Sequence, residues 1–152
     1  MAALTAERSV VRLGPASTGV PIRTSLLVKT GMTIYKGSLV ATDSTGYAIA
    51  GAGISATGLK IWGIATKTVV NSGASGSVSV DVEQGDFLFT NLGGDPVAQT
   101  DIGAGIFCED DQTVRKTSNT STRSAVGTFR GFDPSGSGLV VVRVGNFSQT
   151  GV

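Results

Sequence analysis

The chain of 152 residues contains no histidine and a single cysteine, Cys108. Histidine is the commonest general base and a frequent metal ligand, so its absence argues against acid–base catalysis and against a transition-metal site. A lone cysteine cannot form an internal disulfide, which fits synthesis in a reducing compartment. Cys108 follows Ile106 and Phe107, and in this apolar context we expect a buried structural thiol and not a nucleophile.

Long apolar runs and charged residues are also scarce. The longest apolar stretches, residues 139–142 and 26–28, are far shorter than the roughly 20 residues that a membrane helix needs. Charged residues make up 15% of the chain and the formal net charge is +1, so no overall basic field attracts nucleic acid. Glu7, Arg8 and Arg12 stand where a secretory signal would have its apolar core. We therefore expect a soluble protein with neither a membrane nor a nucleic acid as partner.

Motifs for cofactors and metals are missing as well. Lys36 precedes Gly37 instead of following a second glycine, so no Walker phosphate loop is placed, and no Rossmann fingerprint occurs. Glu109, Asp110 and Asp111 lack the alternating oxygen ligands and the fixed glycine of a calcium loop, which favours a solvated turn. A trimeric jelly-roll nucleotide hydrolase would have a similar length, but the serine-rich phosphate motif and the aspartate–tyrosine motif of that family are absent. We expect no enzyme activity, no cofactor, no metal and no small-molecule substrate.

Glycine, in contrast, is abundant, with 22 residues, and short alternating patterns follow one another along the chain. In residues 77–87, SVSVDVEQGDF, valines alternate with polar residues, as in a strand with one buried face. Short segments of strand character recur at spacings of about 8 to 12 residues, separated by turn-forming residues. The sequence predicts an all-β fold of about ten short strands, arranged as a sandwich or a compact barrel.

The alternating strand is repeated near the end of the chain. Residues 138–147 read GLVVVRVGNF, which again places spaced valines before a glycine and a phenylalanine. Residues 62–64 parallel residues 126–128, and an earlier block matches at a constant offset: Ile34, Gly37, Leu39, Val40 and Asp43 with Ile102, Gly105, Phe107, Cys108 and Asp111. This order predicts two similar halves, about residues 31–87 and 99–147, that close on one core. Chance agreement is the alternative in a chain so rich in glycine and valine.

Residues 1–24 have no clear periodicity, and Gly14, Pro15, Gly19 and Pro21 interrupt any helix. We interpret this segment as an extended N-terminal arm and residues 25–152 as a single β domain, because a chain of this length suits one domain. Such an arm orders against its own domain or against a neighbouring surface, and simple terminal disorder is the alternative.

Charge is distributed in blocks along the chain. In residues 1–42 five bases face one acid, residues 81–111 contain eight acids and no base, and bases predominate again from residue 115. Complementary blocks predict surfaces that meet one another or a charged partner. Scattered solvated faces are the alternative.

Six segments carry a resemblance to a known family. They read SLLVKTGMTIYKGSLVATDSTG, KIWGIATKTV and GSVSVDVEQGDF in the first half, and IGAGIFCEDDQTVRKT, SAVGTFRGF and SGLVVVRVGNF in the second. Together, over residues 25–147, they resemble the small capsid decoration, or cement, proteins of tailed bacteriophages. The motifs are short: a glycine before an apolar pair, a strand ending in Gly-Ile-Ala, and a valine strand ending in glycine and an aromatic residue.

The resemblance implies a compact β-barrel or β-tulip that sits as a homotrimer on the outer surface of the phage head. It implies a structural virion protein, made in the host cytoplasm, that stabilises the head by bridging major capsid protein subunits. The capsid-contact candidates then lie in the arm, and the intersubunit candidates lie in the acidic block and the basic block after it. They are Arg8, Arg12 and Arg23 toward the capsid, and Asp81, Glu83, Asp110, Asp111, Arg115, Lys116 and Arg123 between subunits.

A receptor- or glycan-binding β module of a phage fibre or tail is the alternative function. Sugar-binding modules usually expose several aromatic residues, whereas Trp62, Tyr35 and Tyr47 lie within strand patterns, where packing is expected. Fibre proteins also carry coiled or β-helical stalk repeats, and the chain has none.

Overall fold

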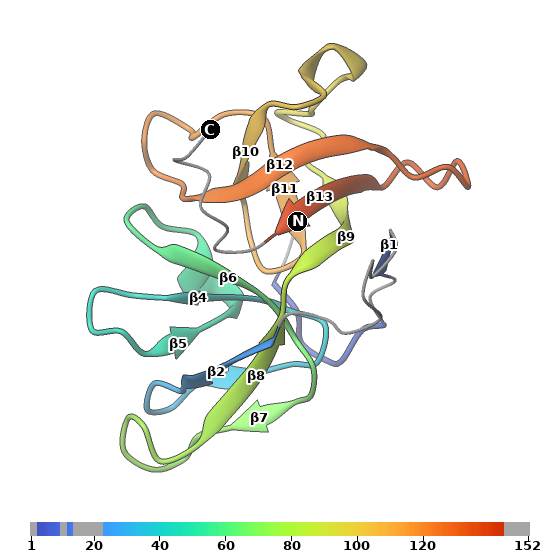
Figure 1. The fold of residues 1–152 in the computed structure, drawn as a ribbon. Coiled ribbons are helices and arrows are strands. Elements are labelled where there is room, and N and C mark those ends of the chain that lie inside the picture. Colours follow the sequence, from blue (N-terminus) through green and yellow to red (C-terminus); the bar gives the residue numbers. More distant parts are fainter. Residues whose placement is uncertain (1–2, 10–11, 14–22, 145–152) are drawn as a thin grey trace.

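The computed structural model describes residues 3–9, 12–13 and 23–144, and these residues form an all-β protein (Figure 1). The predicted fold class is therefore confirmed. The strands are β1 (Arg12–Leu13), β2 (Arg23–Leu27), β3 (Thr33–Ile34), β4 (Leu39–Thr42), β5 (Ala48–Ile49), β6 (Lys60–Ala65), β7 (Val69–Val70), β8 (Ser79–Glu83), β9 (Gly85–Asn91), β10 (Gly105–Cys108), β11 (Thr113–Arg115), β12 (Ala125–Phe132) and β13 (Val140–Val144). Two short 3-10 helices, η1 (Gly51–Ile54) and η2 (Gln99–Asp101), lie in the connections.

The strands form two units that lie one above the other in Figure 1. The first unit is a five-stranded sheet in the order β2-β8-β6-β4-β5, and a parallel bridge between Val28 and Ala48 brings its two edges together. The second unit is the closed ring β9-β11-β10-β12-β13, in which β13 pairs again with β9. The pair β3–β7 accompanies the first unit, and β1 is added to β9.

The two units have the same connectivity. The pairs β2–β8, β8–β6, β6–β4 and β4–β5 of the first unit correspond to β9–β13, β13–β12, β12–β10 and β10–β11 of the second, and all are antiparallel. Each unit is closed by one parallel contact, between β2 and β5 or between β9 and β11. The expectation of two similar halves is thus met by two complete sets of strands.

The repeat is in register at its glycines and displaced elsewhere. Gly63 lies opposite Val40 and Gly127 lies opposite Ile106, and a bulge follows in both ladders. The structure therefore equates Val40 with Ile106, two positions from the Cys108 expected from the sequence. Val82 likewise corresponds to Val142, because the two valines face Ala65 and Phe129 at the same step beyond the two glycines.

The boundary between the halves also differs from the sequence-based one. Residues 77–87 were expected to close the first half, but the structure ends the first unit at β8 and begins the second unit with β9. Gln84 alone separates these two strands, so one extended run passes from the lower to the upper unit (Figure 1). The first strand of each unit, β2 or β9, lies before the segment in which the repeat was recognised.

Each unit has its own core, which corrects the expectation of a single shared one. Val80 and Val82 of β8 pack inside the first unit, whereas Val140, Val142 and Val144 of β13 pack in a different cluster. The reason is closure, since each ring of strands points its inner side chains at its own centre. The cluster of the second unit extends across the junction to residues of the first unit, namely Leu39, Ala41, Ile49, Ile54, Ile61 and Ile64.

Gly127 is required by close backbone packing between β12 and β13. A Cβ atom at this position would lie 1.9 Å from the carbonyl oxygen of Arg143, far inside any contact distance. We expect Gly127→Ala to force the strands apart and to lower the free energy of unfolding by at least about 2 kcal/mol, as measured by chemical denaturation. The matched control is Gly93→Ala, because nothing lies within 4 Å of a Cβ at Gly93. Equal stability of the two variants would contradict this account.

Candidate functional site

A cleft of about 180 Å³ lies where the two units meet. Ile64 and Ala65 of β6 form part of its wall from the first unit, and Phe87 of β9 contributes from the second. Its most prominent feature is charge, because three basic side chains from separate segments surround it together with one acid. These are Arg8 of the arm, Arg23 at the start of β2, Lys36 before β4, and Glu83 at the end of β8.

Arg8 is fixed against the turn that precedes β4. Its backbone N–H donates to the carbonyl of Lys36 at 3.0 Å, and its Nε donates to the carbonyl of Gly37 at 2.8 Å. The guanidinium carbon lies 5.5 Å from the centre of the Phe89 ring, in cation–π geometry. Burial lowers the pKa of Arg8, and the nearby carboxylates of Asp110 and Asp111 oppose this shift. Among the described residues Nη2 of Arg8 has no hydrogen-bond partner, although it is buried.

The rest of the described arm is anchored in the same region. The Leu4 N–H donates to Oδ1 of Asp111 at 2.9 Å, and the Gly51 N–H donates to Oδ2 of the same carboxylate at 3.1 Å. Burial raises the pKa of Asp111, while these two N–H groups and others act in the opposite direction. The hydroxyl of Thr68 also donates to Glu7. Residues 3–9 are therefore ordered against both units of their own chain.

The capsid-contact candidates are only partly brought together. Arg8 and Arg23 line the same cleft, although 15 positions separate them in the sequence. Of Arg12 the structure describes the backbone, which pairs in β1 with Phe87, and its side chain lies outside the described residues. Sequence reasoning missed Lys36 as a site residue, although it belonged to the basic block. The signal in the sequence was the position of Lys36 directly before Gly37, in a turn. In the structure this turn binds Arg8 through the Gly37 carbonyl.

Two of the three cations in the cleft are already partly compensated. Arg23 donates to Oε1 of Glu83 through Nε at 2.9 Å and Nη2 at 2.7 Å, at the surface. Arg8 has the buried carboxylates of Asp110 and Asp111 nearby. Lys36 is exposed, and within the described part of the chain its ammonium forms no ion pair. Lys36 is therefore the cation with most capacity to attract a further anion.

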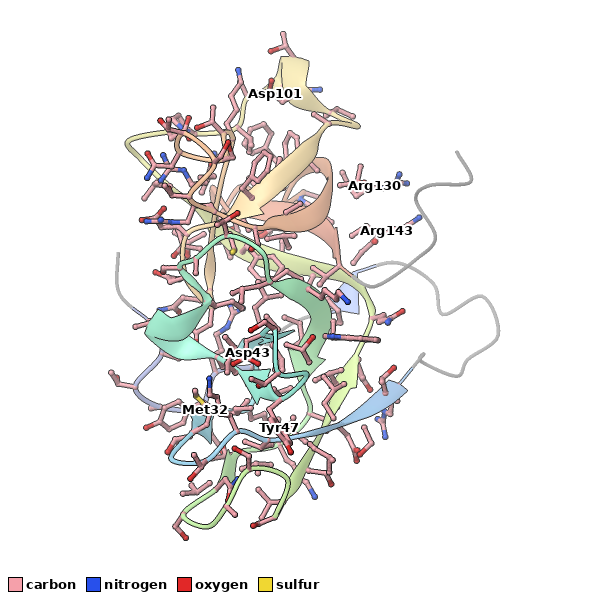
Figure 2. The ribbon with its side chains drawn as sticks, turned by 90° about the vertical axis from the view of Figure 1, so that its left-hand side faces the viewer. Met32, Asp43, Tyr47, Asp101, Arg130 and Arg143 are labelled. Atoms are coloured by element: carbon pink, nitrogen blue, oxygen red, sulfur yellow. The ribbon has the colours of Figure 1, made fainter. Side chains whose placement is uncertain are left out.

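The Arg23–Glu83 pair has a counterpart of reversed polarity in the second unit. Arg143 of β13 donates to Asp86 of β9 through Nε at 2.6 Å and Nη2 at 2.9 Å. Because β2 corresponds to β9 and β8 corresponds to β13, the base and the acid have exchanged strands between the units. Figure 2 shows Arg143 on the second unit, well separated from Asp101 at the far end of that unit.

Burial contradicts two of the intersubunit candidates, and three others have ion-pair partners within one chain. Asp110 and Asp111 are 5% and 1% exposed, so their carboxylates cannot reach a second subunit. Arg115 pairs with Asp95 at 3.0 Å and with Glu109 at 2.6 Å, Lys116 pairs with Asp101 at 3.2 Å, and Arg123 pairs with Glu109 at 3.2 Å. The β10–β11 hairpin and the loops around it bring the acidic and basic blocks together.

The remaining candidates differ from one another. Glu83 is bound to Arg23 of the same chain, whereas the carboxylate of Asp81 has no ion-pair partner among the described residues. Burial alone would raise the pKa of Glu109, but hydrogen bonds from Arg115 and Arg123 outweigh it and lower that pKa. The described residues also contain no group of three or more acidic or cysteine side chains placed to hold a metal ion.

Removal of the Glu109 charge tests the intrachain assignment. Glu109→Gln leaves Arg123 without its carboxylate and Arg115 with Asp95 alone, so we expect the free energy of unfolding to fall by about 1–3 kcal/mol at neutral pH. The loss should not depend on protein concentration, because both partners belong to one chain. Asp81→Asn, with the same change of charge, is the control and should alter stability by less than about 0.5 kcal/mol. A concentration-dependent loss would restore the intersubunit assignment.

Cys108 provides a chemical test of the core of the second unit. Its side chain is fully buried, its Sγ donates to the Ile54 carbonyl at 3.2 Å, and burial raises its pKa to about 11. Because the thiolate is the reactive form, we expect no alkylation of the native protein at pH 8 over hours and complete alkylation in denaturant, followed by mass spectrometry. Rapid labelling of the native protein would show that the second unit opens readily at β10.

Comparisons with known proteins provide no related site. Searches against protein-family models, curated proteins and solved structures found no match. In the described residues there is no helix with the length and apolar character needed to cross a membrane. The candidate site is therefore defined by its own geometry, a cleft at the junction of two similar units with three basic side chains around it.

Proposed function

We propose that this chain is a structural virion protein that binds the outer surface of a tailed-phage head and stabilises it by bridging major capsid protein subunits. The observation that carries the proposal is the junction cleft, where Arg8, Arg23 and Lys36 converge from three segments. The proposal also rests on the resemblance of residues 25–147 to capsid decoration proteins. In this function the cleft binds acidic side chains presented by the capsid surface.

The physical basis is electrostatic attraction combined with repetition. An exposed ammonium such as that of Lys36 contributes little to a single contact, because solvent and salt screen it. On a capsid the same contact is repeated at every bound position, and a homotrimer would engage three sites at once. Linked weak contacts of this kind give strong overall retention by multivalency.

Exposed apolar side chains support a bridging role for both units. Leu27 is 53% exposed and Val70 is 59% exposed on the first unit, and Ile102 is 49% exposed and Phe132 is 39% exposed on the second. On the second unit the Ile102 side chain lies 4.0 Å from the position of a Cβ at Gly131 in β12, the strand that ends at Phe132. A protein with apolar contacts available on each unit is suited to touch two neighbours, whether capsid subunits or further copies of itself.

No specific observation favours the alternative function, a receptor- or glycan-binding module of a phage fibre or tail. A glycan platform needs an exposed aromatic face, but Trp62 is half-buried, and its indole N–H donates to Thr42 at 2.8 Å. Tyr35 and Tyr47 are also half-buried, and Tyr47 lies against Gly76 in the first unit. These aromatic residues support packing in the described structure.

Cosedimentation with heads that lack this protein tests the proposal. We expect the wild-type protein to bind such heads, and Lys36→Glu to bind about three- to tenfold more weakly, because the substitution reverses the free charge at the cleft. The defect should shrink at high salt. Lys60→Glu is the matched control, since Lys60 is an exposed cation at the other end of β6, outside the cleft. Failure of the wild-type protein to bind heads would contradict the proposed function.

A further inference from the structure

The outer edge of β2 carries backbone groups that face away from its partner β8. In an antiparallel pair, alternate residues direct N–H and C=O toward the partner strand. The Val28 N–H donates to the Val78 carbonyl at 2.9 Å, so in the same register Leu26 and Thr24 face β8. Arg23, Ser25 and Leu27 therefore direct their backbone groups outward. All three are exposed. The Val28–Ala48 bridge pairs the Leu27 carbonyl with the N–H of Ala48 in β5, so the described residues leave the outward groups of Arg23 and Ser25 and the N–H of Leu27 without a strand partner.

The second unit shows what covers the equivalent edge there. The N–H of Lys29 donates to the Ala48 carbonyl in the first unit, and the N–H of Leu92 donates to the Val114 carbonyl in the second. These two bonds are equivalent, so Lys29 corresponds to Leu92 and β2 can be aligned with β9 residue by residue. Arg23 then corresponds to Asp86. On β9 this position is paired with β1, because Leu13 lies opposite Asp86 and Arg12 lies opposite Phe87. Further along β9, the Thr90 N–H donates to the Gln112 carbonyl at 3.0 Å.

Thus an added strand covers the start of β9, and no described residue covers the start of β2. Proteins normally protect a free edge with proline, lysine, a bulge or a covering segment. The sequence of β2, Arg-Thr-Ser-Leu-Leu, contains neither proline nor lysine, and it exposes Leu27. The β2–β8 ladder also continues without a register shift from Arg23 to Leu27. This edge is regular enough to pair with a further strand.

Charge indicates which kind of strand fits. On β9 the covered edge begins at Asp86, which lies opposite Leu13 of β1 and is bound to Arg143 of β13. On β2 the edge begins at Arg23, which is already paired with Glu83, but the cleft beside it also holds Lys36, whose ammonium forms no ion pair among the described residues. An acidic residue in the added strand would therefore meet a basic surface at the start of β2.

We propose that the outer edge of β2 accepts an extended, acidic segment of a partner protein as an additional strand. The inference rests on the proposed function, in which that partner is the major capsid protein. Backbone hydrogen bonds to Ser25 and its neighbours supply affinity, as in other cases of strand addition, and the basic residues at the cleft select an acidic sequence. In this arrangement β2 binds the added strand of the partner as β9 binds β1 in the second unit.

Removal of one outward N–H group tests the inference. Ser25→Pro deletes the outward N–H on the edge that no described residue covers. It leaves the β2–β8 hydrogen bonds intact, because proline is tolerated in an edge strand where its nitrogen faces away from the partner. We expect at least a tenfold loss of binding to heads that lack this protein, measured by cosedimentation. Ser25→Thr, which keeps the N–H and favours strand structure, should bind like the wild-type protein. Circular dichroism and thermal unfolding establish that both variants are folded.

Residue-resolved amide hydrogen exchange of the wild-type protein gives a second measurement that needs no variant. In the free protein the amides of Ser25 and Leu27 should exchange faster than those of Thr24 and Leu26. On heads the exchange of Ser25 and Leu27 should slow at least tenfold, and unchanged exchange would overturn the inference.

The outcomes separate the inference from the proposed function. If the wild-type protein and Ser25→Pro bind heads equally, the β2 edge is not the acceptor, and the proposed function stands. If Ser25→Pro instead loses self-association while head binding persists, the occupant is a second copy and the inference is wrong. If the wild-type protein does not bind heads at all, the proposed function fails, and the inference fails with it.

Discussion

The architecture depends on one extended run, residues 79–91, that takes part in both units. Its first part, β8, lies between β2 and β6, and its second part, β9, pairs with β13, β11 and β1. Because Gln84 alone separates the two parts, the orientation of one unit relative to the other is set by a continuous backbone and not by a flexible linker. The junction cleft is a consequence, since Glu83 and Phe87 on this run form part of its wall.

The class of the fold could be predicted from period-two patterns and glycine-rich turns. The equivalence of Gly63 and Gly127 in the two units could also be predicted. Register could not, because a slip of two residues keeps every side chain on the same face and so preserves the hydrophobic pattern. The match of Val40 with Cys108 instead of Ile106 is an error of this kind. The separation into two cores was also hidden, since valines inside two adjacent rings have the same pattern as valines inside one.

The site was less accessible to sequence reasoning than the fold. The basic block of the first 42 residues was visible, and it led to Arg8 and Arg23, but their convergence with Lys36 depends on the path of the arm. The acidic and basic blocks were correctly seen as complementary. Their partners, however, lie in the same chain, because the strands after β9 fold back on one another within the second unit. Arg115, for example, pairs there with both Asp95 and Glu109. Complementary blocks of charge look the same in the sequence whether their ion pairs form within one chain or between two subunits.

The anchoring of Leu4 by Asp111 has a consequence for the order in which the molecule is completed during synthesis. All strands of the first unit are encoded between residues 23 and 83, so this unit can close while the ribosome is still translating the second. Leu4 is made before any of them, yet its acceptor lies 107 residues later in the chain. The segment around Leu4 is therefore among the last to reach its final position although it is made early, and the junction between the units is completed only when the β10–β11 hairpin has been made.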